Sequence, residues 1–108
     1  MTRIATTTTP NSGATIATAY LALRENKPSV SNDLDRIAKM LGARNWKEVN
    51  WTTLDAANVR QLCTLFRGAH GARTRLLGHV KGIVRSGWRM GIFDTETLVR
   101  INDIVVSQ

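Results

Sequence analysis

Residues 73–91, RTRLLGHVKGIVRSGWRMG, combine five basic side chains with no acidic one. Arginine and lysine side chains bind anions, notably the phosphates and guanine edges of nucleic acid. Glycine also interrupts this stretch between the bases, at Gly78 and Gly82. Because each glycine costs a helix interior about 1 kcal/mol relative to alanine, we expect both to let another backbone approach the helix closely.

A helical arrangement sorts the same stretch into two faces, since an α-helix turns about 100° per residue. We interpret the basic face as a surface for the major groove of DNA, which admits a helix. The alternative, a second helix packed on that face, would bury unpaired charges at high cost. The apolar face comprises Leu76, Leu77, Val80, Ile83, Val84, Trp88 and Gly87, the last interpreted as a packing residue. The basic or small face comprises Thr74, Arg75, Gly78, His79, Lys81, Gly82, Arg85, Ser86 and Arg89.

The net charge of the chain is +7 at pH 7, and its distribution is uneven. No acidic residue occurs between Asp55 and Asp94, and that window holds seven bases. The remaining eight bases balance the eight acids, so the window carries the whole excess. Such asymmetry favours a polyanionic partner, with nucleic acid as the first candidate.

A second, weaker polar face is predicted on a helix over residues 29–41. It contains Ser31, Asn32, Asp35, Arg36 and Lys39. Arg36 and Lys39 are candidates for phosphate contacts. Simple solvent exposure would produce the same mixture of charges, so that alternative stays open.

No residue pattern in the chain supports catalysis. His70 and His79 have no carboxylate or cysteine at ligand spacing, so we expect no metal site. The run GAHGART lacks the Lys-Ser/Thr ending of a phosphate-binding loop. We therefore expect a chain that is not an enzyme by itself and has no cofactor.

Several reactive or aromatic side chains are instead expected in the core. Cys63 falls on the apolar side of a predicted helix, and Tyr20 lies at helical spacing with Ile16 and Leu23. The tryptophans could stack on bases, as in single-strand binders. Their apolar surroundings favour core positions for all three: Trp46, Trp51 and Trp88.

Five helical segments are predicted to position these residues, at about residues 13–25, 29–41, 56–66, 73–91 and 95–101. The signals at their ends are a proline for a first turn, a glycine for a C-terminus and two aspartates for N-caps. Apolar residues in the connection 43–54 should hold it on the core. The predicted class is all-α, a compact array of four or five helices. The end signals are Pro28, Gly42, Asp55 and Asp94, and only Ile104–Val106 is β-like.

A length of 108 residues fits one small domain with a modest core. No apolar run approaches the roughly 18–20 residues that span a bilayer. The first residues, MTRIATTTTP, lack the apolar core of a secretory signal, and the polar segment 1–12 is predicted to be flexible. The single Cys63 excludes an internal disulfide and favours a reducing cytoplasm.

The whole pattern resembles the N-terminal core-binding, SAM-like domain of tyrosine recombinases, the group of phage and integron integrases. The matching runs are AYLALRE, DLDRIAKMLG, NWTTLDAANVRQL and ARTRLLGHVKGIVRSGWRMGIFDTETLVRI. The resemblance implies a four- to five-helix orthogonal bundle over residues 13–104 that grips duplex DNA at a core recombination site. The family's fourth helix typically carries a base, a small-residue turn and a second base, and Arg75, Gly78 and Lys81 occupy those places. The helical face adds Arg73, Arg85 and Arg89 as candidates.

The resemblance also implies a separate C-terminal catalytic domain in a parent recombinase, after a tail at residues 105–108. The implied partners are double-stranded DNA, that catalytic domain and other recombinase protomers on DNA, in the bacterial cytoplasm at the nucleoid and without a membrane. Two alternatives stay open: a helical protein-interaction module whose basic face meets an acidic protein, and a small helix-turn-helix transcription regulator. The break between Phe66 and Arg73 is longer than the usual turn of about 3–4 residues in the latter.

Overall fold

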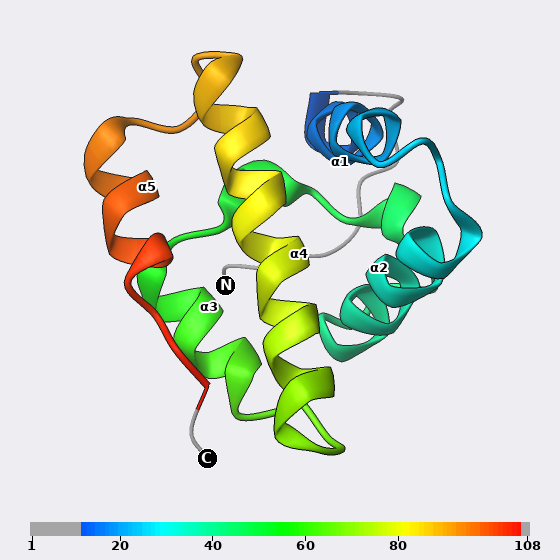
Figure 1. Cartoon of the computed structure of the whole chain (residues 1–108). Helices are drawn as coiled ribbons and strands as arrows, with labels where there is room; N and C mark the ends of the chain where they lie inside the picture. Colours follow the sequence, from blue (N-terminus) through cyan, green and yellow to red (C-terminus); the bar gives the residue numbers. More distant parts are fainter. Residues whose placement is uncertain (1–11, 107–108) are drawn as a thin grey trace.

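A computed structural model of the chain describes residues 12–106, and the described part is built from α-helices and short 3₁₀ helices without a β-strand (Figure 1). The all-α prediction is confirmed. In chain order the elements are α1 (Ser12–Leu23), α2 (Pro28–Met40), η1 (Trp46–Glu48), η2 (Trp51–Thr53), α3 (Ala56–Cys63), α4 (His70–Arg89) and α5 (Thr95–Asn102).

Local signals in the sequence set most of the helix ends. Pro28 lies in the first turn of α2, and Gly42 follows the C-cap of that helix with φ +88°, a value that glycine adopts readily. The Oδ1 atom of Asp55 accepts a hydrogen bond from the Asn58 N–H at 2.7 Å, and Asp94 does the same for Thr97 at 2.8 Å. These four predictions are confirmed.

The cap on α3 gives a stability prediction. Replacing Asp55 with alanine is expected to lower the free energy of unfolding by about 1 kcal/mol, because an N-terminal N–H group loses its partner. Urea denaturation followed by circular dichroism measures this. The matched variant Asp55→Asn keeps a capping oxygen and should lose little. Equal losses in the two variants would show that the cap is not the cause.

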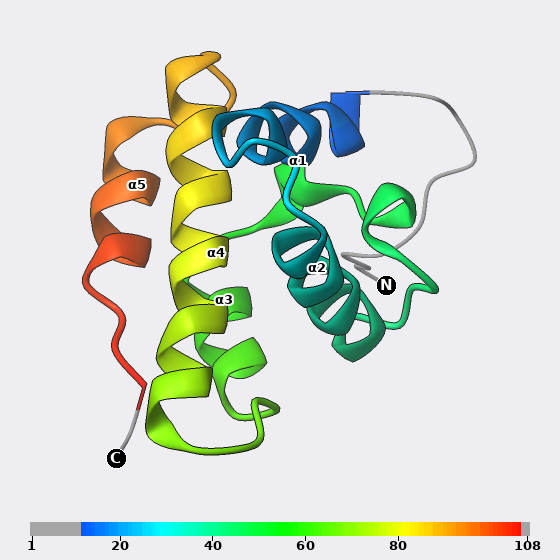
Figure 2. The same ribbon diagram turned by 45° about the vertical axis from the view of Figure 1, so that its right-hand side comes forward.

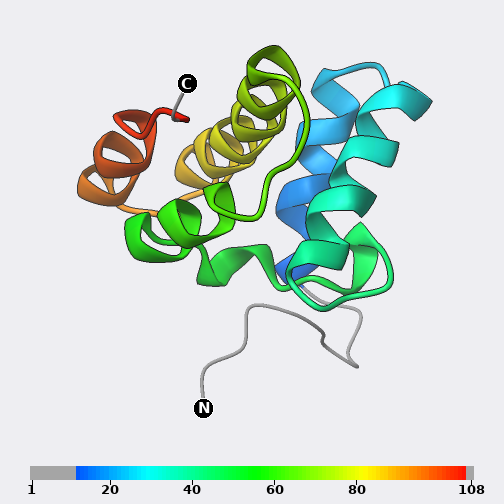
Figure 3. The same ribbon diagram turned by 90° about the horizontal axis from the view of Figure 1, so that it is seen from below.

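The helix α4 lies at the centre of the fold and contacts all four other α-helices. Figures 1 and 2 show it running through the molecule, with α5 on one side and α1 and α2 on the other. Seen along its length in Figure 3, α3 and the 3₁₀ segments lie beneath it, and no described element covers its opposite side. The α4 helix is therefore the central scaffold of the fold and is uncovered along one side.

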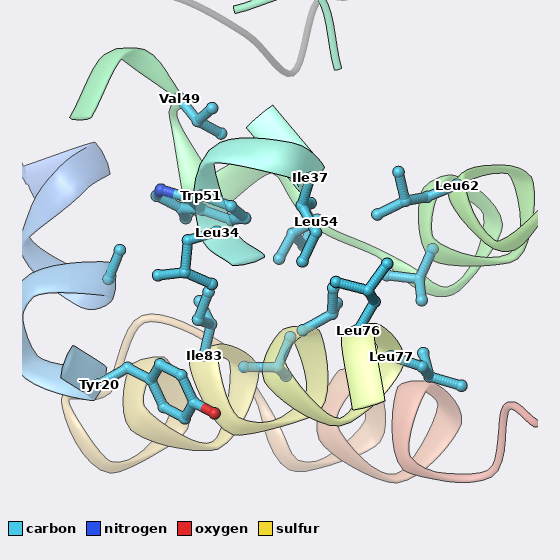
Figure 4. Close-up of a cluster of buried hydrophobic side chains, with 14 of the residues drawn as sticks. Tyr20, Leu34, Ile37, Val49, Trp51, Leu54, Leu62, Leu76, Leu77 and Ile83 are labelled. Atoms are coloured by element: carbon cyan, nitrogen blue, oxygen red, sulfur yellow. The ribbon is translucent and has the colours of Figure 1, made fainter. Parts of the chain in front are cut away.

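The core lies between α4 and the elements beneath it (Figure 4). Trp51 is fully buried, and its indole Nε1–H donates a hydrogen bond to the Trp46 carbonyl oxygen at 3.0 Å. The connection 43–54 is thus held on the core as expected, with Val49 and Leu54 also buried. The apolar residues of α4 complete the cluster, and they are Leu76, Leu77, Val80, Ile83 and Val84.

Two residues expected in the core are exposed. Leu23 is 64% exposed, because it is the last residue of α1 and the chain then turns away through Glu25 and Asn26, both at positive φ. Trp88 is 40% exposed, and its Nε1–H donates to the Thr95 Oγ1 atom at 3.2 Å. Its ring therefore lies over the start of α5 instead of beneath α4.

The helix boundaries also differ from expectation in places. The α4 helix begins at His70 and so includes part of the predicted break, with the Arg73 N–H already bonded to the Ala69 carbonyl at 3.1 Å. The α3 helix ends at Cys63, earlier than predicted, because a turn at Thr64 follows. Ser12 lies in α1, whereas residues 1–11 of the predicted flexible segment fall outside the described part.

Candidate nucleic-acid interface

One face of α4 carries a narrow exposed stripe. All of its members are exposed, and consecutive members are three, four or seven residues apart, so they share one helical face. We call these residues the outer stripe: Gly71, Thr74, Gly78, Arg85 and Arg89. It contains two bases and no acid.

Gly78 lies at the middle of the outer stripe with open space around it. A Cβ atom placed there would meet no heavy atom within 4 Å, apart from the helix's own backbone and neighbouring residues. The glycine is therefore not required by packing within the chain. Another molecule could come as close to the α4 backbone here as a glycine permits.

A pocket of about 490 Å³ lies along one border of the outer stripe. It separates α4 from the segment that follows α5. Thr74 and Gly78 of the outer stripe also line this pocket, so the stripe borders a hollow on this side. The lining residues are His70, Thr74, Leu77, Gly78, Lys81, Ile104, Val105 and Val106.

Gly82 has a different role from the one expected. A Cβ atom there would overlap the Tyr20 ring of α1, with the ring Cζ atom only 2.9 Å away. The glycine makes room for α1, so the alternative of helix packing is correct at this position. Gly87 likewise admits the Phe93 ring, with a Cβ-to-Cδ2 distance of 2.5 Å, and its predicted packing role is confirmed.

The other border of the outer stripe holds a cluster of linked polar side chains. The Arg75 Nε–H donates to the Asp33 Oδ2 atom at 2.9 Å, and Nη2 lies 3.4 Å from Oδ1. The same Oδ2 lies 3.0 Å from His79 Nε2, and His79 Nδ1 lies 2.8 Å from the Tyr20 hydroxyl. An ionised carboxylate only accepts, so Nε2 carries the proton and the tyrosine hydroxyl donates to Nδ1 of the neutral ring.

Burial and charge shift the pKa values of this cluster. Burial lowers the pKa of His79 and outweighs the hydrogen bond and charge of Asp33, which act in the opposite direction. Burial alone would raise the pKa of Asp33, but hydrogen bonds and charges from Arg75 and His79 outweigh it and hold the pKa below its ordinary value. The folded state therefore favours neutral His79 beside ionised Asp33.

This arrangement predicts a pH-dependent stability. The pKa of His79 is lower in the folded chain than in the unfolded chain. The contribution of neutral His79 to the free energy of unfolding is therefore present above about pH 6.5 and is lost as pH falls below that value. The pKa of Asp33 is also lower in the folded chain, so its contribution to the free energy of unfolding is lost as pH falls below about 4. We expect the free energy of unfolding to decrease from pH 7 to pH 5, measured by urea denaturation. His79→Gln, which can still bond Asp33, should flatten that decrease, whereas the exposed His70→Gln should not.

Two predicted DNA-contact residues have partners within the chain. Arg75 is bonded to Asp33 but keeps 51% of its side chain exposed. The Lys81 ammonium donates to the Asn102 carbonyl oxygen at 2.9 Å, at the C-terminal end of α5. A cation there satisfies a terminal carbonyl and the negative end of the helix dipole. Lys81 is thus a structural cap for α5 as well as a residue beside the outer stripe.

Other predicted residues lie outside the outer stripe. Arg73 is partly buried and lines a second pocket, of about 300 Å³, with α3 residues such as Cys63. It lies five residues before Gly78, which turns it by about 140° around the helix. Ser86, predicted on the basic face, is 4% exposed. The structure therefore leaves Arg73 and Ser86 away from the surface on which Thr74, Arg85 and Arg89 gather.

The bases of α2 are also exposed, but apart from the outer stripe. Arg36 and Lys39 lie on the outward side of α2, whose buried side includes Leu34 and Ile37. Arg36 lies one turn after Asp33, and so on the part of α2 nearest the polar cluster. The Asp35 carboxylate, predicted on the same solvated face, accepts the Trp46 N–H at 2.9 Å and holds η1.

Sequence reasoning missed Asp33, the residue that links α2 to α4. A usable signal existed, because Asp33 directly precedes Leu34 on the apolar side of its helix. An acid on a buried face requires a partner, and the excess of bases in α4 offered one. Tyr20 was correctly expected to pack, but its hydrogen bond to His79 has no signature in the sequence.

Comparison of the chain with models of protein families, with curated protein sequences and with solved structures found no match. Among the described residues, no group of three or more His, Cys, Asp or Glu side chains is placed to hold a metal ion. None of the described helices has the length and apolarity to cross a bilayer.

Proposed function

We propose that this chain is a DNA-binding domain without catalytic residues of its own, which places the outer stripe of α4 in the major groove of a duplex. The observation that carries the proposal is Gly78, an exposed glycine with open space above it on a stripe that contains bases and no acid. A merely solvated helix face has no need of this glycine, which disfavours the helix by about 1 kcal/mol.

The dimensions and charge of α4 suit this partner. Its 20 residues span about 30 Å, and a major groove about 12 Å wide admits a helix. Arg85 and Arg89 lie one turn apart on the stripe, where they can reach phosphates while Gly78 faces the groove floor. Phosphate contacts of this kind supply most of the affinity of non-specific DNA binding.

We further propose that the parent protein is a site-specific tyrosine recombinase. This part rests on the sequence resemblance, with the all-α fold consistent with it. In such a parent the domain would form half of a clamp on duplex DNA, and its other partners would be the catalytic domain and further protomers at the core site. A recombinase Arg, His and Tyr set in the reading frame after Gln108 would decide the matter.

Titration of the chain with duplex DNA, followed by amide NMR, tests the binding surface. The largest shifts are expected in α4 from Gly71 to Arg89, with a dissociation constant of about 10⁻⁴–10⁻⁶ M for non-specific contact. Affinity should fall steeply with salt. Shifts that cluster on α3 and η1 would contradict the proposed surface.

The open space at Gly78 gives a matched prediction. Gly78→Leu should leave the fold intact and favour the helix, yet weaken duplex binding by about tenfold, since the α4 backbone would be held away from the groove. The control Ala57→Leu places the same leucine side chain at an exposed position of α3. Fluorescence anisotropy of a labelled duplex measures both, and unchanged binding by Gly78→Leu would exclude close approach at this position.

A protein-interaction module is the second candidate, and one observation favours it. Apolar side chains are exposed around the α4–α5 connection, where Trp88, Met90 and Ile92 are each about 40% exposed. Binding of an acidic protein without binding of duplex DNA would support this alternative. The helix-turn-helix alternative fits less well, because the connection between α3 and α4, residues 64–69, exceeds the usual turn of about 3–4 residues.

A further inference from the structure

Arg75 and its buried partner Asp33 differ sharply in exposure. The Asp33 side chain is 11% exposed, whereas the Arg75 side chain is 51% exposed. The guanidinium is therefore anchored from inside the fold while part of it faces solvent. Burying a carboxylate is costly, and an ion pair at the surface adds little stability. Stability alone therefore gives little reason for this pair, which points to a function of the exposed guanidinium.

The hydrogen bonds occupy only one edge of the Arg75 guanidinium. Nε and Nη2 face the two carboxylate oxygens of Asp33, at 2.9 Å and 3.4 Å. The terminal edge, formed by Nη1 and the second N–H of Nη2, has no hydrogen bond to any described residue. Two parallel donors thus remain for an acceptor pair from another molecule.

The position of Asp33 is itself fixed from a second direction. Its Oδ2 atom also accepts from His79, whose other ring nitrogen accepts from Tyr20 of α1. The carboxylate of α2 is therefore bonded to two side chains of α4, and Tyr20 of α1 holds one of them, His79. An arginine held in this way loses little further rotamer freedom when it binds, and its orientation is defined in advance.

The location of Arg75 favours a base edge over a phosphate. Arg75 lies one turn before Gly78 and at the border of the outer stripe, next to the point where a partner can come closest to the α4 backbone. In the major groove, guanine presents the N7 and O6 acceptors side by side, which match the terminal edge of a guanidinium. Phosphate oxygens offer a similar pair but lie outside the groove floor.

We propose that Asp33 orients Arg75 so that its free terminal edge recognises a guanine in the major groove, which makes the pair a determinant of sequence preference. The proposal rests on the DNA-binding function proposed above. Asp33 is a positioning residue that acts through Arg75 and does not itself touch DNA.

Selection of duplexes with a randomised centre by the full 108-residue chain provides the starting probe. Each guanine of the selected duplex is then replaced in turn by 7-deazaguanine, which lacks the N7 acceptor but keeps the base pair. We expect one position at which this replacement weakens binding about tenfold, within the range for loss of a bidentate contact.

Two variants test the role of the pair. Arg75→Lys keeps the charge but lacks two parallel donors, and Asp33→Asn removes the charge that holds the guanidinium. Both should bind the normal and 7-deazaguanine duplexes equally, whereas Arg85→Lys should still distinguish them. The readout is the ratio of the dissociation constants for the 7-deazaguanine and normal duplexes. Overall affinity is unsuitable, because Asp33→Asn also removes an acid near DNA and changes it. Amide NMR shows whether each variant is folded. If Asp33→Asn does not fold, Arg75→Lys alone tests the proposal.

The outcomes separate this proposal from the broader one. Duplex binding with no sensitive guanine would mean that Arg75 contacts phosphate, and the inference would be overturned while DNA binding stands. Retained discrimination in Arg75→Lys would overturn it equally. No binding of any duplex by the folded chain would overturn the DNA-binding function itself, and this inference with it.

Discussion

Replacing Arg85 and Arg89 together with glutamate is expected to weaken duplex binding by about 60-fold or more at roughly 0.1 M salt. Loss of two phosphate contacts lowers the logarithm of the binding constant by about 0.9 per contact at that concentration, and repulsion adds to the loss. Both residues are exposed on the outer stripe, and neither forms an ion pair or hydrogen bond with other side chains in residues 12–106. Their removal should therefore leave the fold intact.

The control for this double variant changes the same charge elsewhere. The double variant Lys47→Glu with Arg60→Glu alters η1 and α3. These elements lie beneath α4 in Figure 3, on the side away from its uncovered face. Fluorescence anisotropy across a salt series should show a slope reduced by about 1.8 for the stripe variant and little change for the control. If the two double variants lose affinity equally, net charge rather than a defined surface governs binding.

Lys81 is unsuitable for the same charge reversal. Its ammonium binds the Asn102 carbonyl at the end of α5, so a glutamate there would disturb folding and binding together. Arg75 is unsuitable for the same reason, because its loss would leave the buried Asp33 carboxylate without its arginine partner.

Gly82→Ala should lower the free energy of unfolding by about 2 kcal/mol, although alanine favours a helix by about 1 kcal/mol. The added methyl group would overlap the Tyr20 ring, which is 3% exposed and has little room to move. Displacing the ring would also lengthen the hydrogen bond between Tyr20 and His79, now 2.8 Å. Thermal and urea denaturation measure the loss.

Gly78→Ala is the matched comparison on the same helix. Its methyl group would meet open space, so the variant should be more stable by up to about 1 kcal/mol. Stabilisation of both variants would contradict the packing of α1 against Gly82. Replacing Tyr20 with leucine should relieve part of the Gly82→Ala penalty, a non-additive effect expected for residues in contact.

The fold class and helix ends could be predicted because local chemistry determines them. Asp55 and Asp94 cap their helices through side-chain atoms three residues from their targets, and Pro28 and Gly42 act through their own φ angles. Such signals need no knowledge of distant contacts. The apolar face of α4 was equally clear, since helical periodicity alone separates it from the charged face.

The borders of that face could not be predicted. Gly78 and Gly82 look equivalent in the sequence, four residues apart among bases, yet only Gly82 has α1 packed on it. Whether a border residue is open or covered depends on how far neighbouring helices extend around α4. The same limit explains Trp88, which the periodicity placed in the core and the start of α5 leaves exposed.

The contacts on both borders of α4 have a kinetic consequence. Tyr20 at Gly82 and Asp33 at Arg75 hold one side of the helix, and Lys81 at the end of α5 holds the other. These opposed contacts prevent α4 from turning about its own axis, so the outer stripe faces outward before any partner arrives. If duplex DNA binds this stripe as proposed, we expect association without a conformational step, at a rate set by diffusional encounter and electrostatic steering.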